Sequence, residues 1–454
     1  MLALSIAMIV KNEEKNLPRC LTSVQGLFEE LVVVDTGSTD RTVEIARQFG
    51  AKVVPFKWQD NFAAARNAGI AHCTGDWILA IDADEAIDPV DHTAVRSLLT
   101  EGGPQAFRIR VRNYLLNASQ TILNTVPVRN TSAYALGREF THYVDYVTNA
   151  RIFRRFPDVC FSGRIHEVVD PYFEARGLPV GMTTAVLHHF GKVDAPRETY
   201  KREFYLRLCE EEARNAPQNY RALFNLMIQS RTAERWEACL AAAENFMRLQ
   251  KTVPVMVFVT AGICHLQLGN PNTALEWLER ALAIEPEDVG ALTEKGSALM
   301  EMGKFEDACV CLERAAELRP GYTLPYLKLF EIKTSLDLKD AARATLLKAI
   351  RANPTEEVLY NKLLQLSPDI NHLPTAGADA ALALASLPSG GNGLWHRFVA
   401  MSQLQAHKHE EARSTVEIGL QAFPDDAGLS RLKRLCDTAV TPPPVISLPG
   451  QARF

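Results

Sequence analysis

Short apolar runs alternate with amphipathic stretches along the first part of the chain. The apolar runs predict strands at Leu4–Val10, Glu30–Val34, Lys52–Pro55, Asp76–Ile81 and Phe107–Val111. Apolar residues at helical spacing predict helices at Glu13–Gln25, Arg41–Phe49 and Asn61–Ala71. Apolar strands separated by helices are typical of an α/β domain whose mostly parallel, Rossmann-like sheet is covered on both faces. We assign residues 1–199 to this domain, including an irregular polar and aromatic segment at residues 113–149.

From about residue 200 the pattern is helical only, and it repeats every 34 residues. The recurring positions are Gly262, Gly269, Ala274, Ala281 and Pro286, then Gly296, Gly303, Ala308, Ala315 and Pro320, with Ala342, Ala349 and Pro354 in a third copy. A turn glycine, alanines where two helices cross and a closing proline resemble the tetratricopeptide repeat. We expect about five or six units over residues 200–438, including poorer ones near Tyr220–Gln250 and Asp379–Pro388. The proline-rich tail, residues 439–454, is predicted to be disordered.

Composition narrows the classes of function. The 454 residues carry a formal net charge of -5, which argues against general nucleic-acid binding. Nine cysteines without a Cys-x-x-Cys pair indicate reduced thiols, so we expect a cytoplasmic location. The apolar start Met1–Val10 is too short to span a membrane and lacks the features of a signal peptide, and no other stretch approaches membrane-spanning length.

The first four predicted strands all end in polar residues. These are Lys11, Asn12 and Glu13, then Asp35–Asp40, then Trp58 and Asp60, and finally Asp82 and Asp84. Ligands of open α/β sheets bind at this edge. The sequence has no Gly-x-Gly-x-x-Gly after the first strand and no Walker-type phosphate loop. Paired carboxylates imply instead a bridging Mg²⁺ or Mn²⁺ on a diphosphate, although a lone Asp-x-Asp is more often a solvated turn.

Four motifs in the first 90 residues resemble family-2 glycosyltransferases of the GT-A fold. They are Ile-Val-Lys-Asn-Glu-Glu (9–14), Val-Val-Val-Asp-Thr-Gly-Ser-Thr-Asp (32–40), Ala-Ala-Arg-Asn-Ala-Gly (64–69) and Gly-Asp-Trp-Ile-Leu-Ala-Ile-Asp-Ala-Asp-Glu (75–85). Together with the repeats they resemble a bacterial subgroup that includes the peptide S-glycosyltransferases of glycocin biosynthesis. The resemblance implies a metal-dependent, inverting hexosyltransferase that uses a nucleotide sugar and favours a UDP-sugar.

The resemblance also assigns site residues. Asp84 is the more direct metal ligand, Asp82 contacts metal and ribose, and His189 resembles the histidine that closes many such metal sites. The expected donor-binding residues are Val10, Asn12, Glu13, Asp35, Arg66, Asn67, Asp82 and Ala83. Thr36 replaces the second acid of the usual pattern after the second strand, which puts base recognition by that position in question.

Several of these assignments compete with structural roles. Arg66 could be an exposed helix residue, Asn67 a packing residue and His189 a buried structural histidine. Only one of His188 and His189 should face the metal, because neighbouring side chains on a strand point in opposite directions. Inverting members of the family use a carboxylate as base, and we assign that role to Glu167. Asp170 is the alternative base, and Glu167 would otherwise be a salt-bridge partner of Arg164.

The repeats favour a peptide or protein acceptor, or a homodimer, because repeat solenoids form extended concave surfaces. A lipopolysaccharide or another glycan stays open as the acceptor. An inactive nucleotide-sugar-binding scaffold is a second class of function, against which Asp82, Asp84 and His189 argue. A nucleotidyltransferase is disfavoured, because the glycine- and lysine-rich phosphate loop of that class is missing near the N-terminus.

Overall fold

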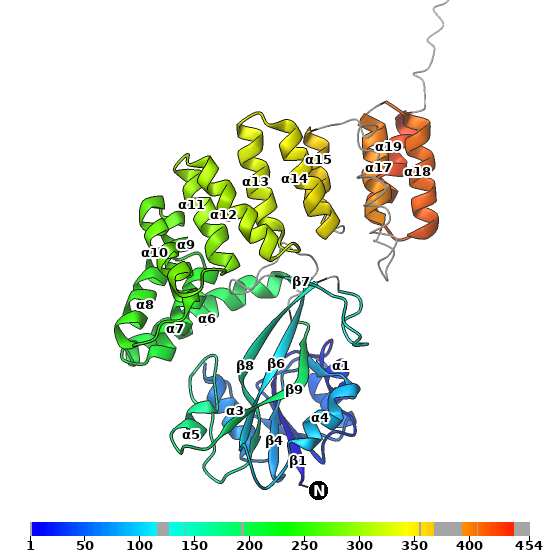
Figure 1. Ribbon diagram of the computed structural model, residues 1–454. Coiled ribbons are helices and arrows are strands. Elements are labelled where there is room, and N and C mark those ends of the chain that lie inside the picture. The colour runs from blue at the N-terminus through cyan, green and yellow to red at the C-terminus, as the bar shows by residue number, and fades with distance from the viewer. Residues whose placement is uncertain are drawn as a thin grey trace, which may run out of the picture. The chain divides into compact units, whose positions relative to one another are not determined.

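The computed structural model describes residues 2–115, 127–140, 142–191, 195–353, 356–366, 393–405 and 407–439 (Figure 1). The chain divides into two compact units, Met1–Cys311 and Leu312–Phe454, so the first helices after the sheet belong to the same unit as the sheet. The domain boundary predicted at residue 199 stays a prediction. The expected repeat around Asp379–Pro388 and the tail after Ala439 lie outside the described residues.

The first half of the sheet is parallel, as the sequence predicts. Its strands are β1 (Leu4–Val10), β2 (Glu30–Asp35), β3 (Lys52–Pro55) and β4 (Trp77–Ala80), in the order β3-β2-β1-β4. The helices between them are α1 (Leu17–Ser23), α2 (Thr42–Gln48) and α3 (Phe62–Ile70). Val10 lies opposite Asp35 in the register, so the strands end at a common edge. The strand order reverses beside β1, and such a switch point opens a crevice at that edge.

The second half of the sheet is mixed, which the sequence did not predict. It contains β5 (Glu85–Ile87), β6 (Ala106–Leu115), β7 (Val128–Arg129), β8 (His142–Arg154) and β9 (Val180–His189). β8 pairs antiparallel with β4, β6 and β7, β5 pairs antiparallel with β9, and only β6 and β9 are parallel. Strands therefore occupy the described ends of the segment expected to be irregular. The remaining elements are the 3₁₀ turn Pro89–Asp91, α4 (His92–Ser97) and α5 (Asp170–Glu174).

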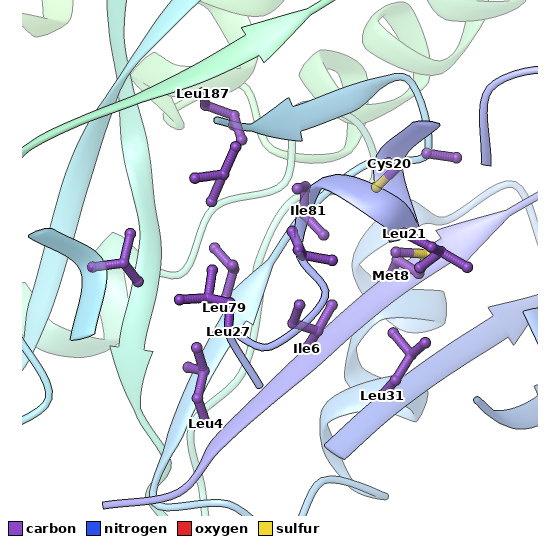
Figure 2. Close-up of a cluster of buried hydrophobic side chains, with 14 of the residues drawn as sticks. Leu4, Ile6, Met8, Cys20, Leu21, Leu27, Leu31, Leu79, Ile81 and Leu187 are labelled. Carbon is purple, nitrogen blue, oxygen red and sulfur yellow. The ribbon is translucent and has the colours of Figure 1, made fainter. Parts of the chain in front are cut away.

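Side chains alternate between the two faces of the sheet along each strand. Both faces are covered, so both sets of side chains are buried. Figure 2 shows one of the two cores, in which Leu4, Ile6 and Met8 of β1 meet Leu79 and Ile81. The α1 residues Leu17, Cys20 and Leu21 cover this face. The intervening residues Ala7, Ile78 and Ala80 face a second core, which includes residues of α3 and α5. This double burial explains why the strands are apolar along their whole length.

The helical region follows the predicted period. Its helices are α6 (Ala195–Asn215), α7 (Tyr220–Thr232), α8 (Trp236–Leu249), α9 (Val255–Gln267), α10 (Pro271–Ile284), α11 (Val289–Glu301), α12 (Phe305–Leu318), α13 (Thr323–Ser335), α14 (Lys339–Ala352), α15 (Glu357–Leu366), α17 (Leu394–Gln405), α18 (His409–Ala422) and α19 (Ala427–Ala439). Successive helices start 34 residues apart in the series α9, α11 and α13. The same spacing holds in the series α10, α12 and α14. The predicted alanines Ala274, Ala281, Ala342 and Ala349 are fully buried. In the described part of the chain, none of the helices combines the length and apolar character needed to cross a membrane.

The turn glycines allow a clean test of the repeat geometry. Gly303 has φ +72°, and a Cβ there would meet nothing within 4 Å, so Gly303→Ala adds only backbone strain. We expect it to lower the free energy of unfolding by about 1 kcal/mol in urea titrations. Gly321→Ala is the matched control, since its φ is ordinary and its nearest atom is 3.7 Å away. Equal stability of the two variants would contradict the strain argument.

Candidate active site

The pairing of β5 with β9 brings Asp84 to His189. β5 starts directly after Asp84, and its antiparallel register sets Glu85 opposite His189. The backbone N–H of Phe190 donates to the carbonyl oxygen of Asp84 at 3.0 Å. As a result Asp84 Oδ2 and His189 Nε2 lie 3.4 Å apart, and each side chain keeps about a quarter of its surface exposed. A carboxylate and an imidazole therefore meet at the edge where the parallel strands end.

Asn113 orients the His189 ring. The parallel register of β6 and β9 places the buried Asn113 beside His189, and Asn113 Oδ1 accepts a hydrogen bond from His189 Nδ1. With this amide orientation assigned, Nδ1 carries a proton. Burial alone would lower the pKa of His189, but the hydrogen bond and the negative charge of Asp84 outweigh it and raise that pKa. Nε2 therefore favours a proton that faces Asp84, and a bound cation would take the place of that proton. A metal-binding imidazole commonly has its second nitrogen held in this way.

His188 faces away from this site, as the alternation along a strand requires. It is fully buried, and its Nδ1 lies 2.7 Å from the hydroxyl oxygen of Tyr114. Burial lowers the pKa of His188 to about 4, so the ring is neutral near pH 7. His188 is therefore a structural residue of the aromatic cluster around Tyr114, and His189 is the histidine at the site.

Gly191 leaves room between the two side chains. A Cβ at this position would lie inside van der Waals contact with Asp84 Oδ2 and 2.7 Å from His189 Nε2. Any larger residue would therefore push one of the two side chains aside. The space beside Asp84 and His189 depends on the absence of a side chain at position 191.

The donor set fits a divalent cation. Asp84 and His189 offer one carboxylate oxygen and one imidazole nitrogen, which Mn²⁺ accepts readily and Mg²⁺ less so. Across the described ranges, no group of three or more His, Cys, Asp or Glu side chains forms a complete metal site. A cation held by these two residues would therefore keep further positions for phosphate oxygens and water.

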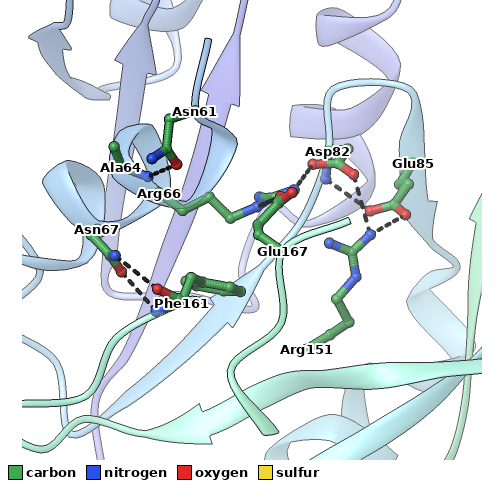
Figure 3. A network of polar contacts seen from close by, with 9 residues as sticks. All are labelled: Asn61, Ala64, Arg66, Asn67, Asp82, Glu85, Arg151, Phe161 and Glu167. Carbon is green, nitrogen blue, oxygen red and sulfur yellow. Dashed lines mark hydrogen bonds and ion pairs between the residues drawn. The ribbon is translucent and has the colours of Figure 1, made fainter. Parts of the chain in front are cut away.

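Asp82, whose side chain is about one third exposed, pairs with two largely buried arginines next to this site (Figure 3). Asp82 Oδ1 is 2.6 Å from Arg66 Nη2, and Arg66 Nε also donates to Glu167 Oε1. On the other side Arg151 Nη2 lies 3.2 Å from Asp82 Oδ2 and 2.5 Å from Glu85 Oε1. Arg66 is buried in α3, so its alternative role as an exposed helix residue is wrong. The metal role expected for Asp82 stays a prediction, because its carboxylate faces two arginines here.

The charges in this network depend on one another. Burial alone would raise the pKa of Asp82, but Arg66 and Arg151 outweigh it and hold that pKa well below its usual range. For Glu85 burial dominates, and the pKa of this carboxyl is raised although Arg151 opposes the shift. Arg66 and Arg151 are thus neutralised by acids that would be unstable in the interior without them.

The donor residues predicted at the ends of β1 and β2 form a connected edge. Asp35 Oδ1 accepts from the backbone N–H of Ser38 at 3.0 Å, which orients the carboxylate at the end of β2. The left-handed Asn12 joins the two loops, since its Oδ1 accepts from Thr39 N and its N–H donates to Ser38 Oγ. Thr36 Oγ1 donates to the carbonyl oxygen of Val10, so Thr36 is a structural replacement for an acid.

Five other residues have structural surroundings. Both polar groups of the Asn67 side chain bond to the backbone of Phe161, which is the packing role considered above. Asp170 is fully buried at the start of α5, bonded to Arg108 and to the N–H of Ala150. Arg164 pairs with Glu211, so the expected alternative of an Arg164–Glu167 salt bridge is wrong. Glu13 accepts from Asn16 through Oε2, and Ala83 is buried.

Sequence reasoning missed Asn113 and Arg151, and it noted Gly191 only as part of the segment after His189, without a role of its own. Arg151 carries a signal, because a charged residue between Ala150 and Ile152, at the more apolar end of β8, needs a partner where that part of the strand is covered. Asn113 and Gly191 carry no such signal, since their roles depend on strand pairing in the mixed half of the sheet.

Comparison with known proteins agrees with the two kinds of fold described above, the α/β sheet and the helical repeats. Residues 5–158 match the model of glycosyl transferase family 2, and residues 257–288 and 289–322 match that of the tetratricopeptide repeat. A TPR repeat-containing protein of Synechococcus elongatus is 37% identical over 42% of this chain and 43% of its own length. An uncharacterized glycosyltransferase of Rickettsia bellii is 42% identical over 40% of this chain and 63% of its own length.

The SPbeta prophage-derived glycosyltransferase SunS of Bacillus subtilis is a more distant relative, 28% identical over 49% of this chain and 47% of its own length. The chain spans less than two thirds of the length of each of these three relatives. The family-2 match runs from β1 through β8 and ends before β9, and the repeat matches lie over helices α9 to α12. The chain therefore contains a glycosyltransferase domain of family 2, followed by tetratricopeptide repeats.

Proposed function

We propose that this protein is a metal-dependent, inverting glycosyltransferase of the hexosyl type that uses a nucleotide sugar and favours a UDP-sugar. One observation carries the proposal: Asp84 Oδ2 and His189 Nε2 lie 3.4 Å apart at the ligand-binding edge of the sheet. The support of Nδ1 by Asn113 and the space at Gly191 add to it. These features suit a ligand that brings a diphosphate and a cation together.

Asp84 and His189 would hold Mn²⁺ or Mg²⁺ in this proposal. When bound, such a cation neutralises the charge that develops as the nucleoside diphosphate leaves. Asp35 would face the nucleoside from the end of β2, and Asn12 would keep the neighbouring loop in place. The arginines beside Asp82 are neutralised by their own acids, so the metal supplies the positive charge toward the donor.

Glu167 remains our proposed base. Arg66 engages its Oε1, so Oε2 is the oxygen that would accept the proton of the acceptor nucleophile. The surroundings of Asp170 favour Glu167 over it, because Asp170 is fully buried and both of its carboxylate oxygens are bonded, one to Arg108 and one to the N–H of Ala150. The proposal of an inverting reaction depends on this base.

For the acceptor we propose a peptide or protein, on the ground that stacked helical repeats offer extended surfaces for chains. A homodimer through the repeats is the other use of such a surface. The nine cysteines include no Cys-x-x-Cys pair, which supports the proposed cytoplasmic location. The proposal is tested against two alternatives. In the first, the acceptor is a lipopolysaccharide or another glycan. In the second, the protein is an inactive scaffold.

The test is donor turnover by the full chain. UDP-glucose, UDP-galactose, UDP-N-acetylglucosamine and GDP-mannose are each incubated with the protein and MnCl₂, and the released nucleoside diphosphate is measured. We expect release from at least one donor, and NMR of the first product should show an inverted anomeric centre. Intact-mass analysis of peptides, proteins and glycans from a bacterial lysate then identifies the acceptor. Binding of a donor without any release would indicate the inactive scaffold.

Gly191→Ala should impair this activity. The added methyl displaces the Asp84 or His189 side chain, and a misplacement near 1 Å at a reacting centre typically costs about 10²-fold in rate. Donor release with Mn²⁺ measures the effect, and far-ultraviolet circular dichroism checks the fold. Gly102→Ala is the control, since a Cβ at Gly102 meets nothing within 4 Å. Full activity of Gly191→Ala would show that the space at position 191 is not needed.

A further inference from the structure

The loop that carries Glu167 has a constrained backbone. Ser162 and Val168 bond to each other through both backbone N–H groups, at 2.9 and 3.0 Å, and so close the loop at its base. Within it Gly163 has φ +95° and His166 has φ +51°, a left-handed conformation that is uncommon for residues other than glycine. A strained residue persists only where its surroundings hold it.

Helix α6 holds the outer side of this loop. The buried Ile165 packs on Leu208 and Cys209 of α6. Arg164 Nη1 is 2.9 Å from Glu211 Oε2, and the backbone N–H of Arg164 donates to Glu212 Oε1 at 3.2 Å. The tip of the loop is therefore bonded to α6 through main chain, apolar and charged groups.

A second loop of the sheet domain joins the same helix. Asp60, which has φ +52°, pairs with Arg207 of α6 at 2.8 Å, and Arg207 in turn lies 3.0 Å from Glu211. The two loops also touch each other, because Phe62 N donates to the carbonyl oxygen of Arg164 at 2.8 Å. Glu211 thus contacts Arg164 of the first loop directly. It also contacts Arg207 of its own helix, which binds Asp60 of the second loop.

Helix α7 adds one more contact. The side-chain amide of Gln229 donates to His166 Nε2 at 2.9 Å, and Gln229 is itself buried. His166 is the left-handed residue directly before Glu167, so this bond acts on the position where the chain turns toward Arg66.

The inner side of the loop leads to the site. Glu167 binds Arg66, and Arg66 binds Asp82 at 2.6 Å, two residues before Asp84. A continuous set of contacts therefore runs from α6 and α7 through Glu167 and Arg66 to the strand end at Asp82 (Figure 3 shows its inner part).

We propose that Arg207, Glu211 and Gln229 of the helical region are positioning residues for sugar transfer. They fix the loop of residues 162–168 so that Glu167 meets Arg66 and Asp82 keeps its place beside Asp84. This inference rests on the proposed function and adds a role for α6 and α7 within the same site. The helical region then serves the chemistry itself as well as any acceptor.

The exposure of the bridging pair makes the role testable. Arg207 and Glu211 are 47% and 30% exposed, and ion pairs at such sites contribute little to global stability. A purely structural role therefore predicts that Glu211→Ala changes almost nothing. A positioning role predicts a loss of rate at unchanged melting temperature, because the loop remains folded but samples other orientations.

The experiment uses the full chain with Glu211→Ala, Glu211→Gln and the control Glu210→Ala on the exposed side of α6. Donor release with Mn²⁺ is measured with the donors of the proposed assay, and hydrogen–deuterium exchange is followed at residues 161–168 and 80–86. We expect Glu211→Ala to lower the turnover number by about tenfold to a hundredfold. Exchange should rise in both segments, the melting temperature should stay within about 2 °C, and Glu211→Gln should be intermediate.

Turnover of Glu211→Ala within about twofold of wild type would overturn the inference. Unchanged exchange at residues 80–86 would overturn it as well, because the contact with α6 would then end at the loop. If the wild-type protein releases nucleotide from no donor, the proposed function fails, and the exchange comparison alone decides whether α6 controls the loop and the strand end.

Discussion

Asp84→Ala is expected to abolish metal-dependent sugar transfer while leaving the protein folded. Removal of one electrostatic group at a reacting centre typically costs about 10²–10³-fold, and loss of the metal with it should add to that effect. The side chain is partly exposed, and the bond from Phe190 N to Asp84 O is made by the backbone. Its removal therefore opens no cavity and keeps β5 beside β9.

Donor release at saturating Mn²⁺ measures this loss, and a thermal unfolding curve checks the fold. Asp158→Ala is a suitable control, because that carboxylate is exposed and pairs with Arg176, which takes no part in the site. Asp84→Ala with half of the wild-type rate would exclude Asp84 as a metal ligand. An equal rate with EDTA present would exclude the metal from the reaction altogether.

Arg66→Met is expected to give the largest loss of stability in the sheet domain. It leaves Glu167 buried without its cation and removes one of the two arginines that hold Asp82. Breaking a buried pair from one side typically costs about 3–5 kcal/mol. We expect about 3 kcal/mol, at the low end, because Asp82 is partly solvated and keeps Arg151.

Urea unfolding of wild type, Arg66→Met, Glu167→Gln and the double variant measures this coupling. The double variant should recover a large part of the loss, since the uncompensated charge on Glu167 is then gone. Arg47→Met on the exposed side of α2 is the control and should stay within about 0.5 kcal/mol of wild type. A loss below about 1 kcal/mol for Arg66→Met would show that the pair is not the buried support described above.

The parallel half of the sheet and the repeats could be predicted because their signals are local. β1 and β3 end where the apolar runs end, and the repeat period of 34 residues reappears in the starts of α9, α11 and α13. In the third copy of the repeat, Asp337 stands where the earlier copies have a turn glycine. It adopts φ +57°, so the turn keeps its geometry without glycine. Turn geometry and helix crossings depend on residues that are close in sequence.

The mixed half of the sheet could not be predicted in the same way. β8 and β9 pair with strands far away in the chain, and an apolar strand carries no sign of its partner's direction. The ion-pair partner of Glu167 depends on this half of the sheet. The sequence suggested Arg164 as the partner, but in the fold the partner is Arg66. Asp84 and His189 were expected together from a resemblance, and only the β5–β9 register explains physically why they meet.

Binding of Mn²⁺ in the presence of UDP tests the central claim most directly. The electron paramagnetic resonance signal of free Mn²⁺ is titrated with the full chain, with and without UDP, and with the His189→Ala variant. The site formed by Asp84 and His189 predicts binding of about one Mn²⁺ per chain that UDP strengthens and that His189→Ala weakens at least about tenfold. Equal Mn²⁺ binding by wild type and His189→Ala, or no effect of UDP on either, would contradict the account.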